Sequence, residues 1–300
     1  MNNYLGALYG SLLLLLLCNQ EAKAQYIYNF SSHNFLQFNP AYAGQDTNHC
    51  FFLGGEYSSE LFKGFKGAPY TNQFSYAGNF KKFRSALAAS GVFSKIGLST
   101  QFDYGIIAYN YNFIINENSN LRVGLNWTER IFHIDLSNTI FNDGADVPNL
   151  SSAETTHGFN FDAGFWYTLK KLNLGFSIQN ILNKRNTQPI SSLYERTINA
   201  ITVYEFLVTK PIKIKPAIIF QNFSGSYSTC LLTNSFVFED TFIFGVGYML
   251  REFTSGPLYI EAGANAGNHV QLMLGYSNTL NNKRSYSFGN ISAMIKVNLF

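Results

Sequence analysis

The sequence is poor in charged residues. Asp, Glu, Lys and Arg make up 13% of its 300 residues, roughly half the share that is usual in soluble proteins. The formal net charge is +3 and no basic run is present, so composition gives no support for nucleic acid as a partner. With so few charges, an ordinary water-exposed surface is hard to build from this chain.

Long hydrophobic runs are also scarce. Beyond the first residues, no apolar stretch reaches the roughly 20 residues that a spanning helix needs, and mean hydropathy is −0.03. This excludes a helical membrane protein. Aromatic residues are abundant instead, at 17%, with 29 Phe and 19 Tyr. Few charges, many aromatics and neutral hydropathy favour a sheet in which apolar side chains alternate with small and polar ones.

Cysteine is rare, with three residues in the chain. Cys18 follows Leu17, whereas a lipobox has a small residue there, so lipidation is not favoured. Cys50 and Cys230 could pair in an oxidising compartment or could be inert packing residues.

The first 24 residues have the features of a secretory signal peptide. Leu5–Cys18 is mostly apolar, and Ala22-Lys23-Ala24 has the A-x-A form of a cleavage site. We therefore divide the chain into a signal peptide at 1–24, an N-terminal segment at 25–49 and a barrel at 50–300.

The repeat on which the rest of the chain is built is clearest in Leu172–Asn180. Its apolar residues are Leu172, Leu174, Phe176 and Ile178, and they alternate with Asn173, Gly175, Ser177 and Gln179. Because successive strand side chains point to opposite faces, one face is apolar and the other small or polar. A segment of about ten such residues fits a strand between lipid and a wet lumen. The pattern recurs about fourteen times, which predicts an all-β, outer-membrane barrel of antiparallel strands.

The lengths of the connections support this prediction. If the chain starts in the periplasm, every second connection is a periplasmic turn, and all of these except the longer Ile114–Asn120 have about two residues: Phe83-Arg84, Ile114–Asn120, Lys170-Lys171, Lys210-Pro211, Glu239-Asp240 and Gly267-Asn268. The expected extracellular loops include the long ones: Phe62–Tyr70, Leu136–Thr156, Asn183–Tyr194 and Thr279–Phe288. Short periplasmic turns and longer outer loops are typical of outer-membrane barrels.

The segment at 25–49 does not alternate cleanly. Pro40 lacks a backbone donor and biases Asn39 towards an extended conformation, while Gly44 permits positive φ. These residues predict an ordered turn, which could lie in the periplasm or plug the barrel. Its role is either to seal one barrel end or to dock a partner.

Several polar residues are expected to point inwards: Arg122, Asn126, Arg130, Asp162, Gln179 and Glu261. They could form a hydrogen-bonded filling of the lumen, since buried charges need partners, or they could line a solute path. A barrel of about fourteen strands allows either arrangement.

The sequence offers little for catalysis or for binding a cofactor or metal. His133 and Asp135 would share a face of a strand end and could form a proton relay, but no further partner is visible. The histidines show no metal-ligand spacing. Gly245-Val246-Gly247 lacks the strand–helix context of a nucleotide loop.

Four short motifs carry a family resemblance. Phe30-Ser31-Ser32 precedes Asn39–Gly44, which is Asn-Pro-Ala-Tyr-Ala-Gly, and Gly67–Thr71 and the acidic Asn142–Pro148 follow. Together with chain length and strand rhythm, these motifs resemble the PorP/SprF family, outer-membrane proteins of the type IX secretion and gliding systems of Bacteroidetes.

The resemblance implies a non-enzymatic outer-membrane component that aids export or anchoring of a partner with a type IX sorting domain. It would also contact the secretion machinery. Within it, Asn39, Pro40, Ala41, Tyr42 and Gly44 are candidates for a structural or docking element. The alternatives are a channel or hydrophobic-solute transporter, and a hydrolase that uses His133 and Asp135.

Overall fold

The computed structural model describes residues 30–45, 49–64, 67–135, 154–182, 195–224, 227–251, 254–279 and 289–299. The expected signal peptide at 1–24, the acidic motif at 142–148 and most of three expected outer loops lie outside these residues. Within the described ranges, no helix is long and apolar enough to cross a membrane.

The described chain is almost entirely antiparallel strand. The strands are β1 His49–Ser58, β2 Tyr70–Phe80, β3 Ser85–Ile96, β4 Thr100–Asn116, β5 Ser119–Ile134, β6 Glu154–Leu169, β7 Leu172–Gln179, β8 Thr197–Tyr204, β9 Phe206–Thr209, β10 Ile212–Phe223, β11 Ser228–Phe238, β12 Phe242–Arg251, β13 Thr254–Ala266, β14 Val270–Thr279 and β15 Asn290–Leu299. Short 3-10 turns complete it: η1 Ser31–His33, η2 Phe35–Gln37, η3 Pro40–Tyr42, η4 Ser59–Lys63 and η5 Lys81–Phe83.

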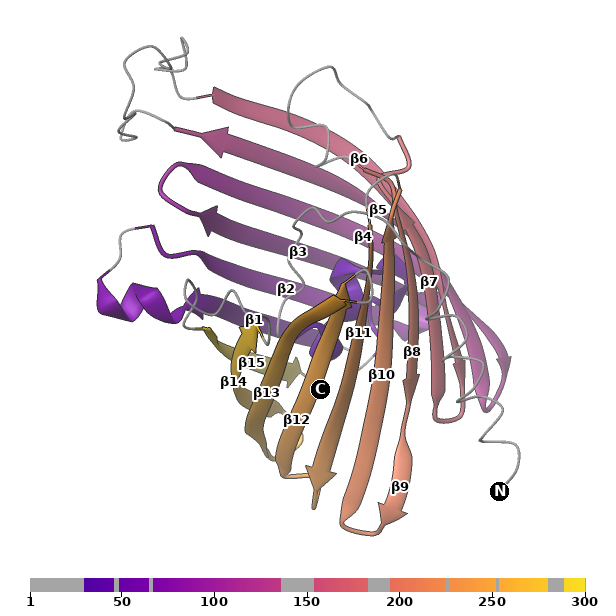
Figure 1. Cartoon of the computed structure of the whole chain (residues 1–300). Coiled ribbons are helices and arrows are strands. Elements are labelled where there is room, and N and C mark those ends of the chain that lie inside the picture. The colour runs from indigo at the N-terminus through magenta and orange to yellow at the C-terminus, as the bar shows by residue number, and fades with distance from the viewer. Residues whose placement is uncertain are drawn as a thin grey trace, which may run out of the picture.

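The sheet closes on itself (Figure 1). Strand β1 pairs with both β2 and β15, so the first and last strands meet. Strands β8 and β9 pair with the same neighbour, β10, so they are two parts of one barrel strand. The barrel therefore has 14 strands, as the sequence predicts.

The interruption between β8 and β9 has a local cause. Strand β10 pairs with β8 as far as Ala217 and with β9 from Ile214. Pro216 lies in the gap between these pairs, where it cannot donate a ladder hydrogen bond because it has no N–H. The missing N–H of Pro216 thus accounts for the break between β8 and β9.

Alternation along the strands separates an apolar outer face from a mostly polar inner face. On β5, Val123, Leu125 and Trp127 are exposed on the outside, whereas Arg122 and Asn126 are buried inside. The same alternation holds on β12, where Phe242 and Phe244 are exposed and Ile243 is buried. In water this outer face would be costly, and in lipid it is the expected surface.

The two ends of the barrel differ. At one end, here called the turn end, the connections are short, and at the other, the loop end, the four longest connections lie. One expectation is wrong in detail: Ile114–Asn120 is not a long connection, because β4 and β5 continue to Asn116 and from Ser119. Three loop-end connections are also short, at 97–99, 224–227 and 252–253.

The N-terminal segment lies inside the barrel (Figure 1). It is built from η1, η2 and η3, and two asparagines cap these turns: Asn34 accepts from Leu36 N–H, and Asn39 accepts from Ala41 N–H. Such caps satisfy donors that a short helical turn leaves open. Gly44 ends the segment at φ +67°, a conformation that glycine adopts without strain.

Candidate functional site

Residues Phe30–Gln45, here called the plug, fill part of the lumen. The predicted site residues lie in its second half, and all five are buried: Asn39, Pro40, Ala41, Tyr42 and Gly44. Asn39 and Ala41 have no exposed surface at all. Their positions suit a structural element that joins the plug to the barrel wall.

Asn39 joins the plug to two strands at once. Its carboxamide nitrogen donates to the carbonyl oxygens of Phe165 on β6 and Phe176 on β7, at 2.9 and 3.2 Å. Its carboxamide oxygen accepts from Ala41 N–H at 2.9 Å. One side chain thus caps a plug turn and bonds the wall, which requires both a donor and an acceptor.

Glycines on the inner face make room for this turn. A Cβ on Gly124 of β5 would lie 2.6 Å from the Ala41 nitrogen. A Cβ on Gly164 of β6 would collide with the Asn39 carboxamide and lie 2.9 Å from Phe176 O. Glycine in a strand often marks such a close approach of another backbone.

Side chains of the wall donate hydrogen bonds to backbone carbonyls of the plug. Asn110 on β4, which is fully buried, donates to Ala41 O at 3.2 Å and to Ala43 O at 2.7 Å. The other donors are Asn79 to Gly44 O, Arg122 to Ala43 O, Ser177 and Asn199 to Phe38 O, and Gln179 to Gln37 O. These bonds satisfy carbonyls that lie outside any sheet ladder.

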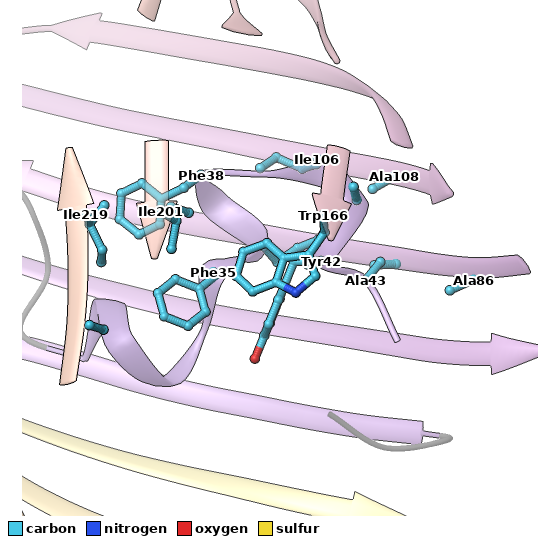
Figure 2. Close-up of a cluster of buried hydrophobic side chains, with 14 of the residues drawn as sticks. Phe35, Phe38, Tyr42, Ala43, Ala86, Ile106, Ala108, Trp166, Ile201 and Ile219 are labelled. Carbon is cyan, nitrogen blue, oxygen red and sulfur yellow. The ribbon is translucent and has the colours of Figure 1, made fainter. Parts of the chain in front are cut away.

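An aromatic cluster completes the contact between plug and wall (Figure 2). Phe35 and Tyr42 of the plug meet Trp166 of β6, with ring centroids 5.5 and 5.0 Å from the indole. Trp166 is 1% exposed. Trp166 points into the lumen, whereas the aromatic residues on either side of it in the sequence point outwards. The burial of the three rings gives the otherwise polar lumen an apolar core.

The first half of the plug is held by fewer polar contacts. His33 Nε2 lies 2.8 Å from Glu261 Oε1 of β13, a carboxylate whose side chain is 2% exposed. Lys296 of β15 donates to His33 O at 3.2 Å, and Asn34 donates to Ser75 Oγ of β2 at 3.0 Å. Phe30 packs among apolar side chains of the wall.

A cavity of about 620 Å³, here called the vestibule, lies between the plug and the strands β6 to β8 and β10 to β15. Its lining includes Asn265, Asn268 and Asn298, which lie close to the turn end. Aliphatic side chains such as Val237 and Ile243 line it as well. The plug therefore packs on one side of the lumen and leaves this space beside it.

Of the six polar residues predicted to point inwards, four are buried and two are half-buried. Arg122, Asn126, Asp162 and Glu261 are buried, and Arg130 and Gln179 are half-buried. Gln179 bonds the plug, and Asp162 accepts from Asn180 N–H at 2.7 Å. What the sequence did not indicate is that Asn110, Asn199 and Trp166 bind the plug, because nothing in the local pattern distinguishes them from other inward residues.

The other candidates for chemistry are His133, Asp135 and the Gly-Val-Gly sequence. His133 lies within 2.8 Å of Thr155 Oγ1 at the loop end, and within the described ranges no cluster of His, Cys, Asp or Glu side chains could hold a metal ion. Gly245 leaves room for the Glu261 side chain, which explains one glycine of the Gly-Val-Gly sequence. Cys50 on β1 and Cys230 on β11 are not joined in a disulfide.

A closed barrel with an apolar exterior and an internal plug defines a plugged membrane β-barrel. The chain belongs to the PorP/SprF family: it matches the family described as "Type IX secretion system membrane protein PorP/SprF" over residues 19–296. None of the curated proteins matches the sequence.

Solved structures with similar folds are outer-membrane barrels. Omp33 of Acinetobacter baumannii is similar with a TM-score of 0.51 and 8% identity, covering 84% of this chain and 98% of that one. A TodX deletion mutant, described as a monoaromatic hydrocarbon channel, gives 0.56 and 10%, covering 91% and 95%. CymD, described in the same words, gives 0.51 and 12%, covering 93% and 95%. At sequence identities this low, the similarity to these structures shows a shared fold and nothing more.

Fold and family together place the protein in the bacterial outer membrane. Lipid therefore surrounds the exposed outer faces of the strands. By the usual asymmetry of such barrels, the turn end faces the periplasm and the loop end faces the outside.

Proposed function

We propose that this protein is a non-enzymatic component of type IX secretion and gliding. It aids the export or surface anchoring of a partner protein that carries a C-terminal sorting domain. The observation that carries the proposal is the family match, which spans residues 19–296.

The plug supports a role in contacts more than a role as a permanently open pore. The wall of β4 to β8 bonds the backbone of the plug through Asn110, Ser177 and Asn199. In the proposal, Asn39–Gly44 act from inside the barrel by fixing the plug. Direct docking of a partner on this motif would first require its withdrawal from the lumen, because its residues are buried.

Contacts with the periplasmic machinery are proposed at the turn end. Lys81, Lys82 and Arg84 are exposed in the connection between β2 and β3, and Lys170 and Lys171 are exposed between β6 and β7. Exposed charges of one sign attract a partner of opposite sign and speed its association. Glu117, Glu239 and Asp240 are also exposed at this end, on other turns, so the acidic surface expected on the partner is the part that meets the two basic turns.

The second candidate is a channel for hydrophobic solutes. The vestibule favours it, because a volume of about 620 Å³ lies within the usual range of ligand pockets. This candidate predicts uptake by the purified protein alone in lipid vesicles, whereas the first predicts a protein partner.

The test is crosslinking in native outer membranes followed by recovery of the tagged protein. Full-length protein should recover a sorting-domain protein and secretion-machine components. The double change K81E/K82E should reduce recovery of the machine components, whereas K63E, a charge reversal at the loop end, should leave it unchanged. Recovery of no sorting-domain protein, together with steady ion conductance of the full chain in a planar bilayer, would overturn the proposal.

A further inference from the structure

Strand β9, Phe206–Thr209, is a sheet edge at the turn end of the barrel (Figure 1). One side of β9 pairs with β10. On the other side the neighbouring strand is β7, and its pairing ends before β9 begins. Leu172, the first residue of β7, pairs with Tyr204, and the last bond beside it runs from Glu205 N–H to the carbonyl oxygen of Lys171, at 3.1 Å. Strand β9 therefore extends past the β6–β7 turn, and none of the described strands pairs with its other edge.

The residues of β9 favour pairing with a further strand. The strand reads Phe-Leu-Val-Thr, without a charge or a proline, and all four residues are exposed. Natural sheets usually protect an edge with charges, proline or a covering segment, because its unpaired N–H and C=O groups can pair with another chain. Since unpaired backbone groups are not found in the hydrocarbon of a bilayer, this edge lies beyond it, on the periplasmic side. A second chain can reach it there.

The charges beside this edge are mostly positive. Lys170 and Lys171 lie in the β6–β7 turn, next to the place that an added strand would occupy, and Lys210 directly follows β9. All three are exposed, and none of the described residues forms an ion pair with them. The nearby carboxylate of Glu205 is already paired with Lys215 at 3.0 Å. A strand that pairs with β9 therefore gains from carboxylates of its own.

A second copy of this chain suits the edge poorly. Two copies paired through β9 would bring their exposed lysines together, and like charges across an interface are costly. The acidic turn Glu239-Asp240 offsets little of this cost, because it lies on the other side of β10, between β11 and β12, and Asp240 is paired with Lys213. The edge therefore suits a different protein that presents an acidic, extended segment.

We propose that β9 is a docking edge, to which a periplasmic protein adds a short, acidic, extended segment as an extra strand. Main-chain hydrogen bonds to β9 hold the segment, as in other cases of strand addition, and Lys170, Lys171 and Lys210 select its charge. The inference rests on the proposed function for the kind of partner, a component of the secretion machinery. It adds to that function the way in which the partner is bound.

Hydrogen exchange of the full chain in lipid nanodiscs tests the docking edge without any other protein. The probe is a short peptide of alternating valine and threonine with glutamate at both ends. At about ten times its Kd, the peptide should slow exchange of the β9 amides that face the edge about tenfold, and exchange in β1 and β15 should not change. The same peptide with a central proline should have no effect, because proline cannot donate to a ladder.

Charge reversal tests the selectivity of the edge in the same experiment. K170E/K171E should weaken binding of the glutamate peptide about tenfold, and it should strengthen binding of a version with lysine in place of glutamate. If the two peptides bound the variant and the unaltered protein equally, the lysines would have no part in docking and the proposal would be overturned.

Recovery of secretion-machine components from crosslinked outer membranes tests the edge in the cell. Proline is tolerated on an edge strand but not in a strand that is paired on both sides, and Val208 has no partner in the pairing with β10. V208P should therefore leave the barrel folded, as checked by its electrophoretic shift on heating, and should strongly reduce recovery of the components. The matched control V208T keeps the N–H and a β-branched side chain, and it should recover as much as the full chain.

Failure of the docking edge and failure of the proposed function give different results. Undiminished recovery by folded V208P, or absence of protection by the glutamate peptide, would overturn the docking edge while the proposed function stands. If even the full chain recovered no machine component, the proposed function would fail, and peptide protection would still decide on the edge. Protection of β9 by vesicles of anionic lipid and not by the peptide, or protection that rises with protein concentration alone, would also overturn the proposal, in favour of lipid or of a second copy.

Discussion

At the scale of single residues, Asn39 joins two wall strands and one plug turn through one carboxamide. Replacing it with alanine removes the donor to Phe165 O and Phe176 O and the cap on Ala41 N–H. Loss of buried hydrogen bonds of this kind costs about 1–3 kcal/mol, which is roughly a tenfold to hundredfold change in an equilibrium.

N39A should therefore speed hydrogen exchange of the plug amides by about tenfold to a hundredfold, while exchange in the barrel strands stays unchanged. Asn39→Asp is the informative comparison, because aspartate keeps the acceptor for Ala41 but places a carboxylate against two carbonyl oxygens. It should loosen the plug at least as much. Unchanged plug protection in both variants would refute the role given to Asn39.

A second prediction at this scale concerns Gly124. Its missing Cβ leaves space for the plug backbone, and an alanine there would lie 2.6 Å from Ala41 N and 2.7 Å from Ala41 Cα. Because the neighbouring atoms are backbone, G124A should destabilise the seated plug by about 1–3 kcal/mol, the usual cost of overpacking.

The control for G124A is G105A on β4, where the nearest atom to a new Cβ is 3.9 Å away. Protease digestion of the plug in folded barrels distinguishes the two variants: G124A should be cut faster, and G105A should resemble the unaltered protein. Equal cutting rates would show that the turn does not need this close approach.

At the scale of elements, the period-two alternation was sufficient to predict the strands. On β7, the inward residues Ser177 and Gln179 now bond the plug, and the outward residues face lipid. Strand ends were harder to place, as at Ile114–Asn120, because alternation does not show how far a hairpin extends beyond the membrane.

Contacts of the plug could not be predicted from the sequence. Asn199 bonds Phe38 O across 161 residues of chain, and Asn39 bonds Phe176 O across 137. These bonds go to backbone carbonyls, which any residue supplies, so the plug sequence carries no pattern that matches a partner in the wall. Pro40 and Gly44 indicated an ordered turn, but not the strands that hold it.

The prediction at this scale concerns a residue on the lipid-facing side of β5. Leu125, in the middle of β5, is 60% exposed on the outer face. Arginine near the bilayer midplane costs about 2–4 kcal/mol, and near the interface about 0–1 kcal/mol. L125R should therefore lower the free energy of unfolding in vesicles by about 2–4 kcal/mol, as measured by urea titration.

Phe83, which is 67% exposed in the connection after β2, provides the control at the turn end. F83R should have a small effect on the same titration. If both variants lost similar stability, the assignment of β5 to the lipid boundary and of Phe83 to its edge would be wrong.

At the scale of the whole molecule, a family match over residues 19–296 and a closed barrel filled by its own N-terminal segment support one account. The barrel fixes the protein in the outer membrane, the plug fills part of the lumen, and the turn end presents exposed charged residues. In this account the protein serves secretion through its partners.

Surface display of a protein with a type IX sorting domain tests this account most directly. Cells that lack this chain are compared with cells that regain it, and the displayed protein is counted on intact cells with an antibody. The account predicts loss of display without the chain and full recovery when it returns. Undiminished display in its absence, with reduced uptake of a hydrophobic solute, would contradict the account and favour the channel.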